Sequence, residues 1–144
     1  MKKILVLNGP NLNMLGIREP GIYGKENYQT LVTMIEAKAE ALGIGVDVRQ
    51  TNWEGQLVDW IQEAYGKFDG IVINPAAYTH TSVALLDAVK AVQIPTVEVH
   101  ISDVNAREEF RRFSYVSLYA KKTIAGYGFD GYRMGLEALK EILG

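Results

Sequence analysis

The sequence contains no cysteine among its 144 residues. Disulfide bonds, thiolate zinc sites, iron–sulfur clusters and cysteine nucleophiles are therefore excluded. Long apolar runs are also missing, since Asn8-Gly9-Pro10 interrupts the run that starts at Ile4. A signal segment needs roughly 7–15 apolar residues and a membrane span about 18. We therefore expect a cytoplasmic protein with no membrane partner.

An excess of charge of one sign is absent too. Fifteen basic residues face seventeen acidic ones, a net charge of −2, so no nucleic-acid partner is expected. The chain is 48% hydrophobic, which suits a packed globular core. At this length the expectation is a single catalytic domain, residues 1–144.

Short apolar runs alternate with segments of helical periodicity along the whole chain. We expect strands at 3–8, 44–50, 70–73, 96–101 and within 115–124, and helices at 27–42, 56–65, 82–92 and 132–143, with a further short helix at 105–112. A long loop fills 9–25. This alternation predicts an α/β fold, a doubly wound five-stranded parallel sheet of order 2-1-3-4-5 with helices on both faces.

In such sheets ligands bind beyond the carboxyl ends of the strands. Polar segments follow the first, third and fourth expected strands, and they contain both histidines, His80 and His100. Glu98 and His100 are two residues apart in a strand, so they point to one face. A carboxylate beside an imidazole fixes its tautomer and favours its protonated form, as a general acid requires. A purely structural Glu–His pair would have the same pattern.

The other candidates are weaker taken singly. His80 precedes a helix for which Thr79, Thr81 or Ser82 could be the N-cap, and a helix N-terminus suits an anion. Arg18 and Tyr23 lie in the glycine-rich loop, where a guanidinium would favour a phenolate. Three arginines, Arg107, Arg111 and Arg112, could bind anions or simply face solvent.

Several binding motifs are absent. No G-x-G-x-x-G follows the first strand, the P-loop lysine is missing, and there is no G-x-S-x-G. Two histidines without cysteine make a poor metal site. The residues therefore give no support to a dinucleotide, P-loop nucleotide or metal site.

Six segments in order resemble the type II 3-dehydroquinate dehydratases and cover nearly the whole chain: Leu5–Gly16, Arg18–Gly24, Glu54–Trp60, Asp69–Ala84, Glu98–Phe110 and 114–117. The resemblance implies a flavodoxin-like domain that dehydrates 3-dehydroquinate to 3-dehydroshikimate in the shikimate and quinate pathways. It also implies an anti elimination through an enolate, no cofactor or metal, and a homo-oligomer of trimers assembled into a dodecamer.

The resemblance further implies residue roles. Tyr23 would remove the proton next to the ketone, and Arg18 would favour its ionised form. Asn11 would hold a water at the enolate oxygen. His100 would protonate the departing hydroxyl, and Glu98 would orient His100.

The remaining implied contacts concern substrate binding. Asn74, His80 and Arg111 would bind polar groups of the substrate, and the backbone of Ile101 and Ser102 would bind its carboxylate. Residues 17–25 would act as a lid, which Arg107 would contact. Asp87 would reach the site of a neighbouring subunit. The chain departs from the family pattern at Asp103, Asn105 and Phe113. Asp103 would add a negative charge near an anionic substrate.

Two alternatives stay open on the residues alone. One is a non-catalytic flavodoxin-like module that binds a nucleotide, flavin or anion, although the loop Asn11–Met14 lacks the hydroxyls and glycines that cradle phosphate. The other is a dehydratase that uses a lysine Schiff base, which needs a desolvated lysine. Most lysines fall at the termini or on polar helix faces.

Overall fold

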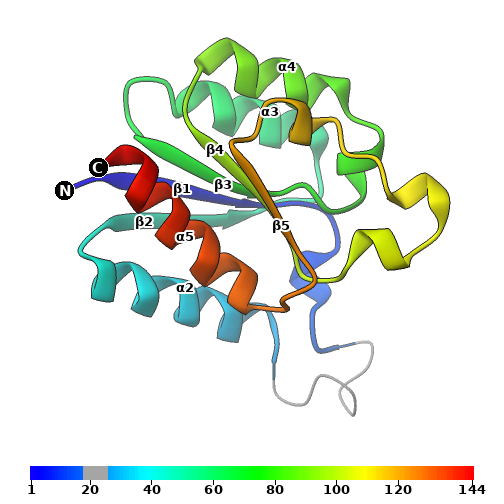
Figure 1. The fold of residues 1–144 in the computed structure, drawn as a ribbon, viewed down its shortest axis with the longest axis horizontal. Helices are drawn as coiled ribbons and strands as arrows, with labels where there is room; N and C mark the ends of the chain where they lie inside the picture. Colours follow the sequence, from blue (N-terminus) through cyan, green and yellow to red (C-terminus); the bar gives the residue numbers. More distant parts are fainter. Residues whose placement is uncertain (18–25) are drawn as a thin grey trace.

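A single parallel sheet organises the computed structural model, which describes residues 1–17 and 26–144 (Figure 1). Its strands are β1 (Lys3–Asn8), β2 (Gly45–Gln50), β3 (Gly70–Asn74), β4 (Thr96–His100) and β5 (Lys122–Ala125). They are all parallel and lie in the order β2-β1-β3-β4-β5. The predicted strand order and fold class are therefore confirmed.

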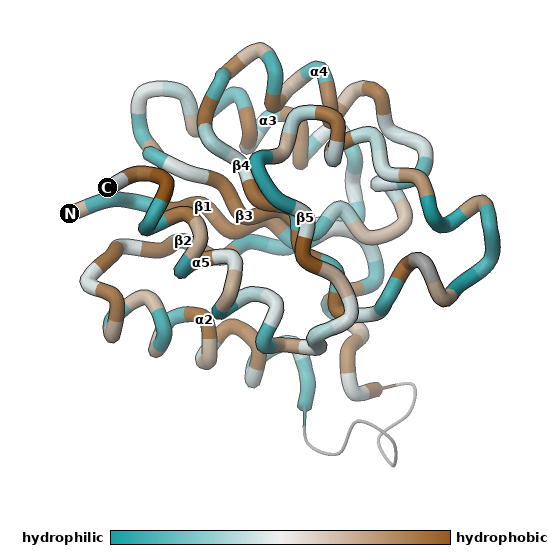
Figure 2. The backbone as a smooth tube through the Cα atoms, viewed as in Figure 1, coloured by the Kyte–Doolittle hydropathy of each residue, from teal (hydrophilic) through white to brown (hydrophobic). Residues whose placement is uncertain are grey.

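Two helices cover each face of the sheet (Figure 1). On one face lie α2 (Tyr28–Leu42) and α5 (Asp130–Leu143), and on the other α3 (Glu54–Glu63) and α4 (Val83–Val92). Alternate strand residues supply two cores: Val6 and Val72 pack toward α2 and α5, whereas Leu7 and Ile73 pack toward α3 and α4. The central strands β1 and β3 are accordingly apolar along most of their length (Figure 2).

Helix ends follow the local chemistry. Asn27 caps α2 by accepting a hydrogen bond from the backbone N–H of Thr30 at 2.9 Å. Gly43 ends the same helix at φ 71°, a conformation that glycine adopts without strain. Of the three candidate caps for α4, Ser82 is the N-cap, and its Oγ accepts from the N–H of Leu85 at 3.0 Å.

The region after β4 differs from the expectation. The predicted helix at 105–112 was wrong, because two separate 3₁₀ helices lie there, Val104–Ala106 and Glu109–Arg111. Glu108 separates them, since its backbone is extended at ψ 149° and cannot continue a helix. The fifth strand occupies only the end of 115–124 and runs on to Ala125, because Val116–Leu118 forms another 3₁₀ helix.

The loop after β1 begins with a short 3₁₀ helix, Leu12–Met14. Arg18 and Tyr23, which were predicted as site residues, lie outside the described residues. Within the described ranges, no helix has both the length and the apolar character needed to cross a membrane.

Candidate active site

The carboxyl ends of β1, β3 and β4 carry two groups of polar side chains, which the sheet separates. Glu98 and His100 alternate with Val97 and Val99, which face α2 and α5, so the acid–base pair points to the opposite face. Asn8 of β1 and Asn74 of β3 are register partners, and by the alternation of strand residues they belong to the face of the sheet that packs against α5. The pleat of the strands therefore gives each face its own polar cluster.

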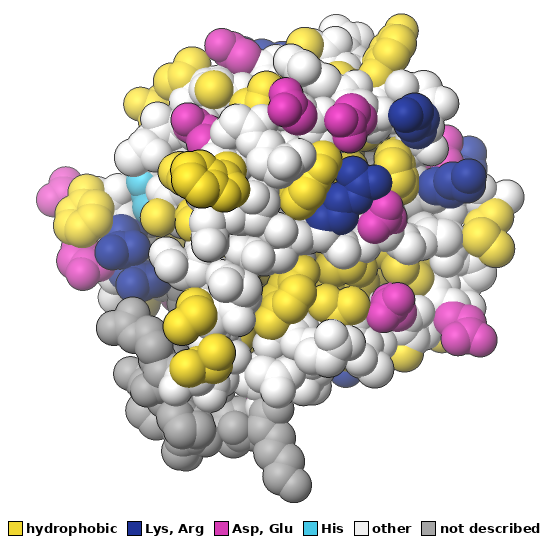
Figure 3. Space-filling model, turned by 180° about the vertical axis from the view of Figure 1, so that it is seen from behind, with side chains coloured by type: hydrophobic (Ala, Val, Ile, Leu, Met, Phe, Trp, Pro, Cys, Tyr) yellow, Lys and Arg dark blue, Asp and Glu magenta, His cyan; other side chains and the backbone are white. Residues whose placement is uncertain are grey.

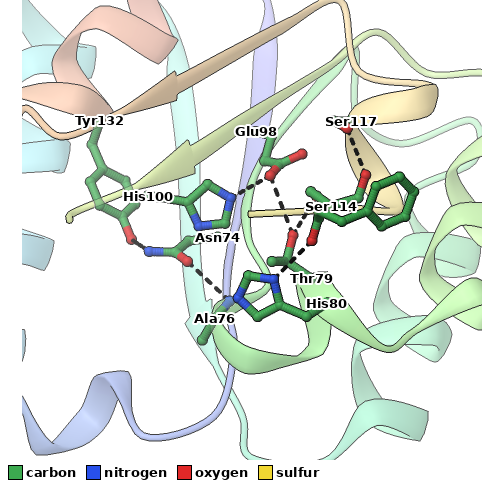
Figure 4. Close-up of polar contacts among 10 residues, drawn as sticks. Asn74, Ala76, Thr79, His80, Glu98, His100, Ser114, Ser117 and Tyr132 are labelled. Carbon is green, nitrogen blue, oxygen red and sulfur yellow. Dashed lines mark hydrogen bonds and ion pairs between the residues drawn. The ribbon is translucent and has the colours of Figure 1, made fainter. Parts of the chain in front are cut away.

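Glu98 and His100 form a buried, hydrogen-bonded pair at the end of β4. Glu98 is 0% exposed and His100 is 5% exposed. His100 Nε2 contacts Glu98 Oε2, and the Thr79 hydroxyl donates to the same carboxylate oxygen at 3.3 Å (Figure 4). With Nε2 engaged, Nδ1 is the ring nitrogen that can serve a substrate. The predicted pairing of these two side chains is confirmed in geometry.

The 3₁₀ helix that follows β3, Ala76–His80, is fastened to residues 113–115. The backbone N–H of Tyr115 donates to Thr79 O at 2.9 Å, and His80 Nδ1 lies 2.8 Å from Phe113 O. Because a carbonyl only accepts, Nδ1 must carry the proton, and a neutral His80 presents Nε2 as an acceptor. His80 can therefore accept a hydrogen bond from a hydroxyl of a ligand. Phe113 contributes through its backbone, so its departure from the family pattern leaves this contact possible.

The second cluster centres on Tyr132 of α5, which is fully buried. Its hydroxyl donates to Asn8 Oδ1 at 2.7 Å. The same hydroxyl accepts from Asn74 Nδ2 at 2.9 Å (Figure 4). Burial raises the pKa of Tyr132 well above its ordinary range, so the phenol stays neutral. Asn74 Oδ1 in turn accepts from the N–H of Ala76 at 3.0 Å and holds the turn after β3. In this structure both ends of the Asn74 amide are engaged within the protein.

Replacing Tyr132 by phenylalanine should lower the free energy of unfolding by about 2–4 kcal/mol, because two buried amide groups lose their partner. Chemical denaturation followed by circular dichroism measures this loss. Tyr127→Phe is the matched control: Tyr127 is 59% exposed, and the free energy of unfolding should change by no more than about 0.5 kcal/mol. Equal effects of the two substitutions would show that Asn8 and Asn74 find other partners.

Basic side chains follow the pair along the chain. Arg111 Nε lies 2.9 Å from Glu108 Oε2, and its guanidinium stacks over the Phe110 ring at 5.3 Å. The backbone N–H of Glu108 lowers the pKa of its carboxyl, and Arg111 and Arg107 lower it further. An anionic ligand would therefore compete with an ionised Glu108 for Arg111. Figure 3 shows Lys and Arg side chains grouped near a histidine at one edge of the molecule.

Other predicted site residues lie around this edge. The N–H of Asn11 donates to Asn52 Oδ1 at 3.0 Å, and Asn11 has φ 70°. Ile101 and Ser102 follow β4 directly and are partly or fully accessible. Asp87 lies on α4 with an exposed side chain, and within the described residues it forms no ion pair.

A cavity of about 690 Å³ opens beside Glu98, lined among others by Ser114, Ser117 and Thr123. Glu98 Oε1 is buried and, among the described residues, has no hydrogen-bond partner. The same part of the chain contains no group of three or more His, Asp or Glu side chains that could hold a metal ion.

Sequence reasoning missed three residues of these clusters. Thr79 was considered only as a helix cap, Tyr132 only as a core or interface aromatic, and Ser114 only as part of a matching segment. Their partners lie 19 to 124 residues away in the chain, a separation at which no periodicity rule applies.

Comparison with known proteins shows which proteins the chain is similar to. Residues 2–140 match the family described as dehydroquinase class II. A protein of Clostridium acetobutylicum named 3-dehydroquinate dehydratase is 53% identical over 98% of both chains. One of Pseudomonas aeruginosa, 3-dehydroquinate dehydratase 2, is 56% identical over 97% of this chain and 95% of its own. A crystal structure of type II dehydroquinase from Butyrivibrio crossotus superposes with a TM-score of 0.92 at 52% identity, covering 96% and 97% of the two chains.

Proposed function

This chain belongs to the class II dehydroquinase family and dehydrates 3-dehydroquinate in the shikimate pathway, and we propose that it does so by an anti elimination through an enolate. The observation that carries the mechanism is the buried Glu98–His100 pair, because it provides an oriented imidazole at the ligand-binding edge of the sheet.

The proposed reaction has two proton transfers. The Tyr23 phenolate, which Arg18 stabilises, removes a proton from the carbon between the ketone and the carbon bearing the departing hydroxyl. The electron pair moves onto the ketone oxygen, where a water held by Asn11 stabilises the enolate. The enolate then re-forms the ketone and the new C=C bond, while the C–O bond breaks and His100 Nδ1 donates its proton to the leaving hydroxyl. The products are 3-dehydroshikimate and water.

The remaining polar residues bind the substrate in this proposal. His80 accepts a hydrogen bond from a substrate hydroxyl, and Arg111 binds a polar group after exchanging its partner Glu108. The N–H groups of Ile101 and Ser102 hold the carboxylate, and Arg107 contacts residues 17–25. Asn74 serves the substrate only if its amide gives up one of the contacts to Tyr132 and Ala76.

Ultraviolet absorbance of the protein mixed with 3-dehydroquinate tests the proposal, since dehydration creates a conjugated enone. We expect absorbance to grow at the same rate with a chelator or with borohydride present. Borohydride inactivation that requires substrate would instead indicate a lysine Schiff base. No growth with folded, assembled protein would overturn the activity.

We further propose that the chain is one catalytic domain, located in the cytoplasm, which assembles as trimers within a dodecamer. Large apolar side chains at the surface support assembly, among them Val83 on α4 at 48% exposure and Leu118 at 61%. Asp87 lies one turn after Val83 on that helix, where it could reach a neighbouring subunit's site. Analytical ultracentrifugation should give a mass near twelve chains, and a monomer with full activity would contradict the role of Asp87.

A further inference from the structure

The two oxygen atoms of the Glu98 carboxylate differ in their hydrogen-bond partners. Its Oε2 atom receives both His100 Nε2 and the Thr79 hydroxyl, whereas Oε1 is buried without a hydrogen-bond partner among the described residues. Thr79 is thus the one neutral donor to this carboxylate within that part of the chain. A buried carboxylate depends strongly on the few groups that hydrogen-bond to it.

The direction of the hydrogen bonds around Thr79 can be deduced. The Thr79 hydroxyl donates to Glu98 Oε2, so its proton points toward that oxygen. Thr79 Oγ1 also lies 2.5 Å from Ser114 Oγ. Since the Thr79 proton is already used, Ser114 must donate to Thr79. Ser114 therefore donates to Thr79, and Thr79 donates to Glu98 Oε2, the same oxygen that the Nε2–H of His100 contacts (Figure 4).

The backbone gives this chain a rigid support. Thr79 is fully buried, and its carbonyl accepts from Tyr115 N–H at 2.9 Å, directly beside Ser114. Ser114 is half-buried, and its carbonyl accepts from the Ser117 hydroxyl at 2.6 Å. Two segments that are distant in sequence are therefore locked together where they meet the acid–base pair.

We propose that Thr79, held by Ser114, is a positioning residue that fixes the Glu98 carboxylate and through it the proton-donating orientation of His100. This inference rests on the proposed function, in which His100 protonates the leaving hydroxyl. Thr79 touches neither substrate nor reacting atoms. Its loss leaves the first proton transfer, by Tyr23, intact and slows only the second.

The two transfers can be measured separately in D2O. When the enolate forms but the hydroxyl leaves slowly, the phenol of Tyr23 exchanges its proton with solvent and returns deuterium to the substrate. Mass spectrometry of recovered 3-dehydroquinate gives the exchange rate, and absorbance gives the dehydration rate. A smaller fraction of active enzyme lowers both rates equally, whereas a misoriented His100 raises the ratio of exchange to dehydration.

For Thr79→Val, which keeps the shape and removes the hydroxyl, we expect dehydration kcat to fall about 10-fold to 100-fold, part of the ~10²–10⁴ that general acid catalysis contributes. KM should stay within about two-fold and the exchange-to-dehydration ratio should rise about tenfold or more, since ground-state contacts are unchanged. Thr79→Ser should keep at least about a third of wild-type kcat because the hydroxyl remains. Ser114→Ala should raise the ratio by a smaller factor.

Thr96→Val is the matched control. Thr96 is also fully buried, lies on the same strand and face as Glu98, and donates to Ile94 O at 2.9 Å. Its loss should leave the exchange ratio at the wild-type value. An unchanged ratio in Thr79→Val, or equal impairment in Thr79→Ser, would overturn the proposal. If Thr79→Val does not fold, an unchanged ratio of exchange to dehydration in Ser114→Ala would overturn the proposal instead.

Failure of the proposed function gives a different result. Wild-type protein that dehydrates nothing refutes the activity, and a His100→Gln variant without exchange refutes the stepwise enolate reaction. The experiment tests the role of Thr79 once the wild-type protein is seen to dehydrate 3-dehydroquinate and the His100→Gln variant is seen to exchange deuterium into it.

Discussion

Replacing His100 by alanine should lower kcat for dehydration by about 10²–10⁴-fold, the usual contribution of a general acid. His100 is the acid because its Nε2 is engaged by a buried carboxylate, which leaves Nδ1 oriented to deliver a proton. The absorbance assay under saturating 3-dehydroquinate measures the change. KM should change little, because the proton is transferred in the transition state.

A second substitution separates catalysis from stability at this position. His100→Ala leaves the buried Glu98 side chain without its imidazole partner, and leaving a buried polar group unpaired costs about 1–3 kcal/mol, or more for a charged group. His100→Gln retains an N–H that can contact Glu98 but has no proton to give. We expect the same loss of kcat with a smaller loss of stability. Wild-type turnover in both variants would refute the acid role.

Replacing Tyr23 by phenylalanine should also lower kcat by about 10²–10⁴-fold, because the substitution removes the hydroxyl oxygen that acts as the base. Unlike the His100 variants, this enzyme should lose deuterium exchange together with dehydration, since no enolate forms. Recovered substrate from D2O should therefore carry no label.

Tyr65→Phe is a suitable control for the Tyr23 substitution. Tyr65 is 71% exposed, so the Tyr65→Phe variant should keep wild-type rates of both exchange and dehydration. Exchange that persists in Tyr23→Phe would assign the base to another group, and dehydration at the wild-type rate would remove Tyr23 from the mechanism.

Much of the fold could be predicted from local patterns. The boundaries of β1 were correct, and α2 and α4 each began within one residue of the expected start. Asn27 and Ser82 each accept a hydrogen bond from the backbone N–H three residues later, as N-caps do. Because that contact is local, the sequence indicates it directly. The region after β4 was predicted less well, because its 3₁₀ helices are too short to have a periodicity and Glu108 interrupts them.

The site was partly predictable for the same reason. Glu98 and His100 share a face because strand residues alternate, which is a local rule. The same rule, applied to the observed register, places Asn8 and Asn74 on the opposite face, beside α5. The sequence could not reveal that Tyr132 of α5 would lie between them, since that contact spans 124 residues.

By itself, the sequence determined the order of the elements, the parallel sheet and the edge at which its polar residues gather, because each depends on spacing along a strand or helix. The tertiary structure alone decided which side chains hold the acid–base pair. Thr79 meets Glu98, and Ser114 meets Thr79, only because the turn after β3 and residues 113–115 pack over β4. Such contacts arise from the packing of distant segments, and no local pattern of residues encodes their partners.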